Sequence, residues 1–224
     1  MNRADSRDET LSHQSHERRE VYRRPYDPKR PQVCIDETSK QLLEHTRTPI
    51  PASPGTLARV DDEYKRCGTA NIFLCVEPLK GKTVVEATEH RAKVDFAQFV
   101  RDLCDGPYRD ASKLVVVMDN LNTHSIASLY EAFPPAEARR LAEKLEIHFT
   151  PKHGSWLDIA EIELSVLARQ CLHQRIGSLA ELRKILRIWE KQRNAEPHAV
   201  SWRFTTEDAR IKLRRLYPTL ARDK

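Results

Sequence analysis

Residues 113–119 read KLVVVMD, and this stretch decides the fold. An apolar run of this length, bounded by a lysine and an aspartate, is typical of a strand covered on both faces. A second apolar strand, QVCIDE at residues 32–37, also runs into acidic residues. Ligands gather outside the carboxyl ends of strands in open α/β sheets, so we expect Asp36 and Asp119 to border one crevice. Taken alone, Asp119 could instead simply cap the following helix.

The segments around these strands alternate between apolar runs and helical periodicity. Residues 38–45 are interpreted as a short helical turn, and residues 46–68, rich in proline and glycine, as a long loop. Further strands are predicted at 70–76, 82–88 and 146–150, and helices at 93–104, 124–132, 135–145, 157–173, 178–193 and 206–216. Three early strands followed by alternating helices and strands predict an α/β fold, with a mixed sheet flanked by helices and extra C-terminal helices.

The composition of the 224 residues narrows the class of protein. Residues 1–30 are polar or proline-rich and are predicted to be a disordered or linker segment, which leaves 31–224 as one domain. The five cysteines are scattered without a C-x-x-C pair, which indicates reduced, mostly buried thiols. No apolar run approaches the ~20 residues that span a bilayer, so we expect a soluble, intracellular protein with no membrane partner. The net charge of +5 only weakly favours a polyanionic partner.

A third acidic residue is expected on the helix that follows the strand at 146–150. Leu157, Ala160, Leu164, Leu167 and Cys171 recur at helical spacing and form its apolar face. Glu161 and Glu163 flank that face almost symmetrically, so the periodicity does not choose between them.

Several long segments, in order, resemble the DDE transposases of the mariner superfamily, specifically its bacterial insertion-sequence branch. They are VCIDE, RCGTANIFLCVEPL, VVVMDNLNTH, SLYEAFPPAEARRLAEKLEIHFTPKHGSWL, AEIELSVLARQCL and WRFTTEDARIKLRRLYP, and the resemblance runs from about Tyr22 to Pro218. The resemblance implies an RNase H-like fold for the catalytic domain. It also implies that Asp36 and Asp119 are the first two catalytic aspartates and that Glu161 is the third acid, with Glu163 as the alternative.

The same resemblance implies the chemistry. Three carboxylates repel one another unless cations neutralise them, so the cluster is expected to hold two Mg²⁺ or Mn²⁺ ions. These would support cleavage of double-stranded DNA at the element ends and strand transfer into target DNA by a homodimer. The family's usual asparagine is replaced here by Asp158, whose extra negative charge could alter metal affinity.

Other residues are predicted to assist. Asn120 and His124 belong to the D-N-x-x-x-H motif that begins at Asp119, and His124 could orient that aspartate or contact the scissile phosphate. DNA contacts are expected from Lys152, His153, Trp156, Arg47 and Arg59, although Trp156 could equally be a core residue.

The segment at residues 1–30 contains no helix-turn-helix pattern, so we expect a separate DNA-binding polypeptide to recognise the element ends. The expected location is the bacterial cytoplasm, associated with the nucleoid. Two alternatives stay open: an inactive relic that acts only in DNA binding or assembly, and a general RNase H-like nuclease that cuts RNA–DNA hybrids.

Overall fold

A single mixed sheet organises the computed structural model, which describes residues 21–22, 24–57, 59, 61–121, 124–150 and 159–200. Its strands are β1 (Gln32–His45), β2 (Tyr64–Glu77), β3 (Lys82–Thr88), β4 (Leu114–Met118) and β5 (Leu145–Phe149). The order across the sheet is β3-β2-β1-β4-β5. The first three strands form an antiparallel meander, and β4 and β5 run parallel to β1. β1 runs beside β4 only from Gln32 to Cys34 and then continues past the end of β4.

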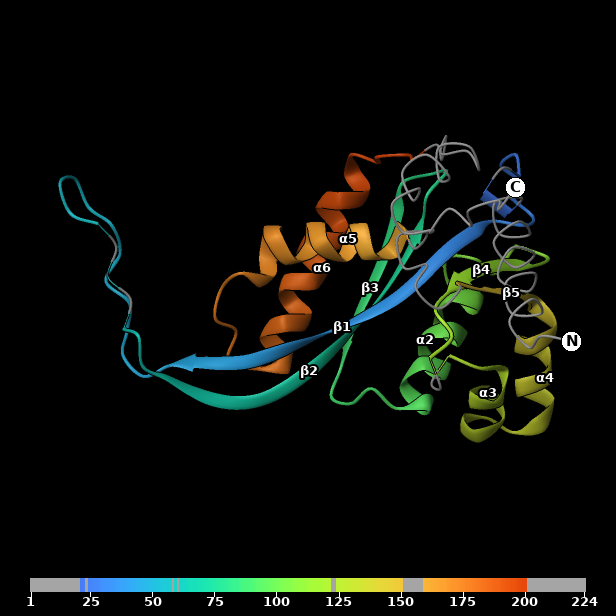
Figure 1. Ribbon diagram of the computed structural model, residues 1–224, viewed down its shortest axis with the longest axis horizontal. Helices are drawn as coiled ribbons and strands as arrows, with labels where there is room; N and C mark the ends of the chain where they lie inside the picture. The colour runs from blue at the N-terminus through green and yellow to red at the C-terminus, as the bar shows by residue number, and fades with distance from the viewer. Residues whose placement is uncertain are drawn as a thin grey trace, which may run out of the picture. The chain divides into compact units, whose positions relative to one another are not determined.

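Helices cover both faces of this sheet (Figure 1). On one face lie α2 (Lys93–Asp105), α3 (Ile126–Ala132) and α4 (Pro135–Lys144). On the other lie α5 (Ile159–Leu167), which continues into the π-helical turn η2 (Ala168–Leu172), and α6 (Leu179–Ala195). Helix α5 packs on β1 and β2, and α6 packs on β3. The sheet is therefore the middle layer of three.

The alternation of side chains along β1 assigns each residue to one of these faces. Val33 and Ile35 belong to the core under α2, together with Phe73 and Phe99, whose rings stack with centroids 5.5 Å apart. Because successive side chains of a strand point to opposite faces, Cys34 and the residues two apart from it face α5 instead. Asp36 therefore belongs to the face that α5 covers.

Two expectations for the segment after Asp36 are wrong. Residues 38–45 continue β1 as a strand, where we expect a helical turn, and β2 begins at Tyr64, which shortens the predicted loop of 46–68 to residues 46–63. The two segments pair with each other, from Thr38 opposite Ile72 to His45 opposite Tyr64. Cross-strand pairing fixes this backbone more strongly than the weak local preference of a polar sequence does.

The pairing produces a long hairpin that we call the arm, residues 43–66. Figure 1 shows the arm extending past the helices that cover the rest of the sheet. The arm emerges after a register shift between Gln41 and Leu43, and its inner part is held by a hydrogen bond from Leu43 N to Ile176 O, 2.8 Å.

The chain divides into two compact units, one made of residues Met1–Arg24 and Ser201–Lys224 and the other of Pro25–Val200. All elements above belong to the second unit. The predicted disorder of residues 1–20 and the predicted helix at 206–216 lie outside the described residues, as does Leu157. Within the part that is described, no helix is long and apolar enough to cross a membrane.

Candidate active site

Asp36 lies inside β1, just past the stretch that pairs with β4, and Asp119 directly follows β4. The expectation that Asp36 ends its strand is wrong, because β1 continues to His45. Cys34 pairs with Val117, and two residues further along each strand are Asp36 and Asp119. Burial, followed by the charges of Glu37, Asp119 and Glu161, raises the pKa of Asp36 to about 6, although a hydrogen bond from the backbone N–H of Glu37 opposes the shift. A carboxylate whose pKa is raised by three other carboxylates has surroundings suited to a cation.

The two candidate glutamates of α5 have different surroundings. Glu161 is exposed, and its charge reaches Asp36. Glu163 is 6% exposed and accepts hydrogen bonds from Arg193 Nε at 2.6 Å and Nη2 at 2.9 Å, and from Thr83 Oγ1 at 3.1 Å. Glu163 thus ties α5 to α6 and β3, whereas Glu161 is free of these contacts and its charge acts on Asp36.

His124 joins the end of β4 to the neighbouring strand. Its Nδ1 lies 2.6 Å from Asp119 Oδ1, and its Nε2 lies 2.7 Å from Glu37 Oε2. The second contact is an ion pair rather than a hydrogen bond, because neither atom has a hydrogen-bond partner of acceptable geometry. The imidazole is fully buried and lies against Phe96, with ring centroids 4.8 Å apart.

His124 and its two carboxylate neighbours, Asp119 and Glu37, stabilise one another's charged forms. Burial alone would lower the pKa of His124, but the carboxylates of Asp119 and Glu37 raise it to about 9, so the ring is positively charged at neutral pH. The hydrogen bond from His124 in turn lowers the pKa of Asp119. At neutral pH, Asp119 is therefore held as a carboxylate.

Comparison with known proteins identifies the family of the chain. Residues 31–183 match the family described as DDE superfamily endonuclease. The chain belongs to this family. No curated protein matches it.

The fold of this DDE endonuclease is similar to that of Mos1 transposase in several solved structures. A Mos1 paired-end complex with the left transposon end is 14% identical, with a TM-score of 0.55, and the match covers 81% of this chain and 53% of that one. The Mos1 strand transfer complex is 14% identical, with a TM-score of 0.53 and coverages of 80% and 51%. A Mos1 mariner paired-end complex with Mn is 15% identical, with a TM-score of 0.50 and coverages of 81% and 55%. The likeness confirms the predicted α/β, RNase H-like fold, and the chain spans about half the length of these proteins.

The donor set of the DDE endonuclease has the chemistry that a hard divalent cation requires. Asp36, Asp119 and Glu161 supply carboxylate oxygens, the ligands that Mg²⁺ and Mn²⁺ prefer. The raised pKa of Asp36 reflects burial and a repulsion that a cation would relieve. The described residues nevertheless contain no group of three Asp, Glu, His or Cys side chains placed closely enough to hold an ion. The three side chains are thus of the type that binds Mg²⁺ or Mn²⁺, but they would have to move closer together to hold an ion.

The remaining predicted site residues divide into three groups. Asn120 is exposed next to Asp119. Arg47 and Arg59 lie on the arm, where Arg47 pairs with Asp61 at 3.4 Å and the backbone of Arg59 bonds to that of Ile50. Figure 1 shows that the arm extends from the carboxyl end of β1 away from β4, so these two arginines are not brought to Asp119, which follows β4. Lys152, His153, Trp156 and Asp158 lie outside the described residues.

One residue of the site was missed by the sequence reasoning. Glu37 follows Asp36 directly, and its side chain is only 3% exposed. It contacts Arg91 at 3.3 Å in addition to His124. The signal that could have indicated it is a second acid in the middle of a strand whose alternate residues are buried, since a carboxylate in such a place needs partners.

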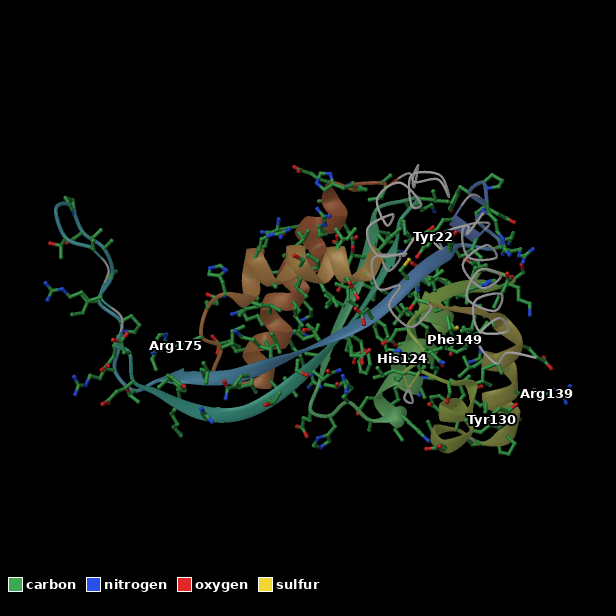
Figure 2. All side chains as sticks on the ribbon, in the orientation of Figure 1. Tyr22, His124, Tyr130, Arg139, Phe149 and Arg175 are labelled. Atoms are coloured by element: carbon green, nitrogen blue, oxygen red, sulfur yellow. The ribbon has the colours of Figure 1, made fainter. Side chains whose placement is uncertain are left out.

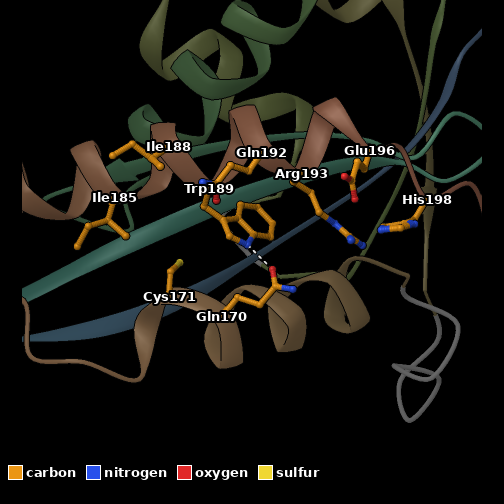
Figure 3. Close-up of a pocket in the computed structure, with 9 residues that line it drawn as sticks. All are labelled: Gln170, Cys171, Ile185, Ile188, Trp189, Gln192, Arg193, Glu196 and His198. Atoms are coloured by element: carbon orange, nitrogen blue, oxygen red, sulfur yellow. Dashed lines mark hydrogen bonds between the residues drawn. The ribbon is translucent and has the colours of Figure 1, made fainter. Parts of the chain in front are cut away.

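A cavity of about 400 Å³ lies elsewhere, between η2 and α6 (Figure 3). Its lining includes Trp189, whose indole N–H donates to Gln170 Oε1 at 2.7 Å, and Arg193, whose guanidinium is bound to Glu163. None of the three carboxylates of the candidate site lines it. We place the chemistry around Asp36, where β1 passes the end of β4, because that is where the acidic groups interact.

Proposed function

We propose that this chain is the catalytic part of a DNA transposase of the mariner kind, from an insertion sequence, and that it cuts and joins phosphodiester bonds. The observation that carries the proposal is the electrostatic convergence of Asp119 and Glu161 on Asp36, where β1 passes the end of β4 in a DDE endonuclease. The match to Mos1 complexes with a transposon end and with a strand-transfer product supports double-stranded DNA as the partner.

Asp36, Asp119 and Glu161 would hold the divalent cations, two Mg²⁺ or Mn²⁺ ions, and the Mos1 complex with Mn supports this choice. When bound, the cations supply positive charge for the attacking and leaving oxygens of an in-line displacement. The chain's own contribution is to keep the carboxylates ionised and oriented. His124 does so at Asp119 by donating to Oδ1, and the backbone N–H of Glu37 does so at Asp36.

Further parts of the proposal concern the assembly. The arm would contact DNA or a second copy of the chain in a homodimer, with Arg47 and Arg59 as candidate phosphate contacts. Lys152, His153 and Trp156, which precede α5, would contact DNA near the scissile bond. A separate helix-turn-helix polypeptide would recognise the element ends, and the protein would act at the bacterial nucleoid in the cytoplasm.

Strand transfer tests the proposal. The full chain is incubated in Mg²⁺ with a labelled duplex taken from the DNA that flanks its gene, together with a supercoiled plasmid. We expect covalent joining of the duplex to the plasmid, lost in Glu161→Gln. An RNA–DNA hybrid of equal length serves as the competing substrate. Cleavage of the hybrid without any joining of the duplex would contradict the proposal and indicate a general RNase H-like nuclease.

A second function, DNA binding or assembly without cleavage, is favoured by one observation. No group of three ligands among the described residues is already close enough to hold an ion. The two functions differ in their response to metal, because a ligand that binds only the folded state raises its stability. A melting temperature that rises with Mn²⁺ in the wild-type chain, and not in Asp36→Ala, favours the transposase. An unchanged melting temperature in both favours the second function.

A further inference from the structure

Glu37 is a buried carboxylate beside the candidate site. Its side chain is 3% exposed, and an isolated charge in such a place would be costly. The cost is offset by two cationic partners: Arg91 Nη1 lies 3.3 Å from Oε1, and His124 Nε2 lies 2.7 Å from Oε2. Each oxygen of Glu37 therefore faces one partner, which fixes the plane of the carboxylate.

His124 is held at both ends of its ring. Nε2 faces Glu37, and Nδ1 contacts Asp119 Oδ1 at 2.6 Å. The ring is fully buried and lies against Phe96, so it cannot rotate without leaving a carboxylate unpaired. The orientation of the imidazole is thus determined by Glu37 on one side and is transmitted to Asp119 on the other.

The hydrogen bonds to the Asp119 side chain all reach the same oxygen, Oδ1, in the described part of the chain. The backbone N–H of Leu121 also donates to Oδ1, at 3.3 Å, so both hydrogen bonds end on the same atom. Within the described part of the chain, Oδ2 accepts none. Asp36 has the same pattern, since the N–H of Glu37 donates to its Oδ1 at 2.8 Å. The described part of the chain thereby holds each aspartate through its Oδ1.

We propose that Glu37 is a positioning residue for the metal site: it fixes His124, and His124 fixes the carboxylate of Asp119, which would hold the cation. This rests on the proposed function, in which Asp119 is a metal ligand. Glu37 would not touch the substrate or the metal. It acts through one intervening ring, as carboxylates behind metal ligands commonly do.

Metal affinity is the property that separates positioning from a purely structural role. If Glu37 only stabilised the fold through Arg91, its loss would lower the melting temperature, and the folded protein would bind Mn²⁺ as before. If it positions Asp119, affinity falls even in a chain that remains folded. Loss of a group behind a metal ligand typically weakens metal binding by about 10–100-fold.

The test measures free Mn²⁺ by electron paramagnetic resonance during titration of the full chain, without DNA, for the wild type and for Glu37→Gln, Asp119→Ala and Glu163→Gln. Glu163 is the matched control, because it is a buried carboxylate held by an arginine but has no contact with His124 or Asp119. We expect loss of binding in Asp119→Ala, a Kd raised by about 10–100-fold in Glu37→Gln, and an unchanged Kd in Glu163→Gln.

Two results would overturn the inference in distinguishable ways. If Asp119→Ala loses Mn²⁺ and folded Glu37→Gln binds it as tightly as the wild type, Glu37 is not a positioning residue and the proposed metal site stands. If Asp119→Ala binds Mn²⁺ normally, the proposed metal site itself fails. Should Glu37→Gln not fold, His124→Gln serves instead, because it can still donate to Asp119 but breaks the link to Glu37. Wild-type affinity in that variant is equally contrary to the proposal.

Discussion

The charged carboxylate of Asp36 destabilises the folded protein, and a bound cation would offset this loss of stability. Its pKa is about 6 in the folded chain, above its usual value of 3.8. As pH rises through this interval, the unfolded chain releases the proton before the folded chain does, so stability is lost, and the loss is complete above about pH 6. At neutral pH without divalent cations, the charged Asp36 therefore opposes folding.

We predict that Asp36→Asn stabilises the metal-free protein at pH 7.5 by about 1–3 kcal/mol, and that the gain shrinks as the pH falls below 6. Urea unfolding in EDTA at pH 7.5 and pH 5 measures the difference in unfolding free energy between the variant and the wild type. Asp110→Asn is the control, because its side chain is 88% exposed, and it should change stability at neither pH. An Asp36→Asn chain that is less stable than the wild type at pH 7.5 would contradict this account of the site.

The choice between Glu161 and Glu163 shows what the sequence can and cannot predict at this scale. Helical periodicity predicts that both residues flank the buried face of α5, whereas Glu163 is buried within it and Glu161 is exposed. It does not indicate that Arg193, on another helix 30 residues later, binds Glu163. Only the folded contact separates the two, whereas family resemblance selects Glu161 independently of it. For Glu37, the partners Arg91 and His124 are equally remote in sequence.

At the scale of elements, the apolar strands could be predicted and the arm could not. The run Leu114–Met118 is a strand in almost any surroundings, because it is apolar throughout and buried on both faces. The arm contains mainly polar residues, and its strands exist because each pairs with the other across a turn 18 residues long, residues 46–63. Such pairing is a property of two segments together, which periodicity within either one does not reveal.

The arm depends on Arg175, which lies at its base (Figure 2). The guanidinium donates to Glu63 O at 3.0 Å and to Asp62 O at 3.2 Å and lies over the ring of Tyr64. We predict that Arg175→Ala accelerates amide hydrogen exchange at the base of the arm by about 10-fold, as expected when charged hydrogen bonds worth about 1.5–3 kcal/mol are lost.

Exchange elsewhere in the sheet should stay unchanged in Arg175→Ala. The control is Arg169→Ala, because Arg169 Nη1 donates only to Ser165 on the adjacent helical turn, at 2.9 Å. Equal exchange rates for the arm in the wild type and Arg175→Ala would show that strand pairing alone holds it.

At the scale of the whole molecule, the sheet and α2 form the core that supports the candidate site. Phe99 is 2% exposed and stacks on Phe73 of β2. We predict that Phe99→Ala lowers the free energy of unfolding by about 3–5 kcal/mol, because it leaves a cavity between the helix and the sheet. Urea unfolding measures the change, with Val94→Ala, 42% exposed on the same helix, as the control. Equal losses in both variants would refute this view of the core.

The central claim is that Asp36, Asp119 and Glu161 form the catalytic site of a DDE endonuclease. The most direct measurement is Mn²⁺-dependent nicking of supercoiled plasmid by the full chain and by Asp119→Ala, Glu161→Ala and Glu163→Gln, each first shown to be folded. We predict a loss on the order of 100-fold or more in the first two, as when a group that stabilises developing charge is removed, and retained nicking in Glu163→Gln. Retained nicking in Glu161→Ala, or its loss in folded Glu163→Gln, would contradict the account.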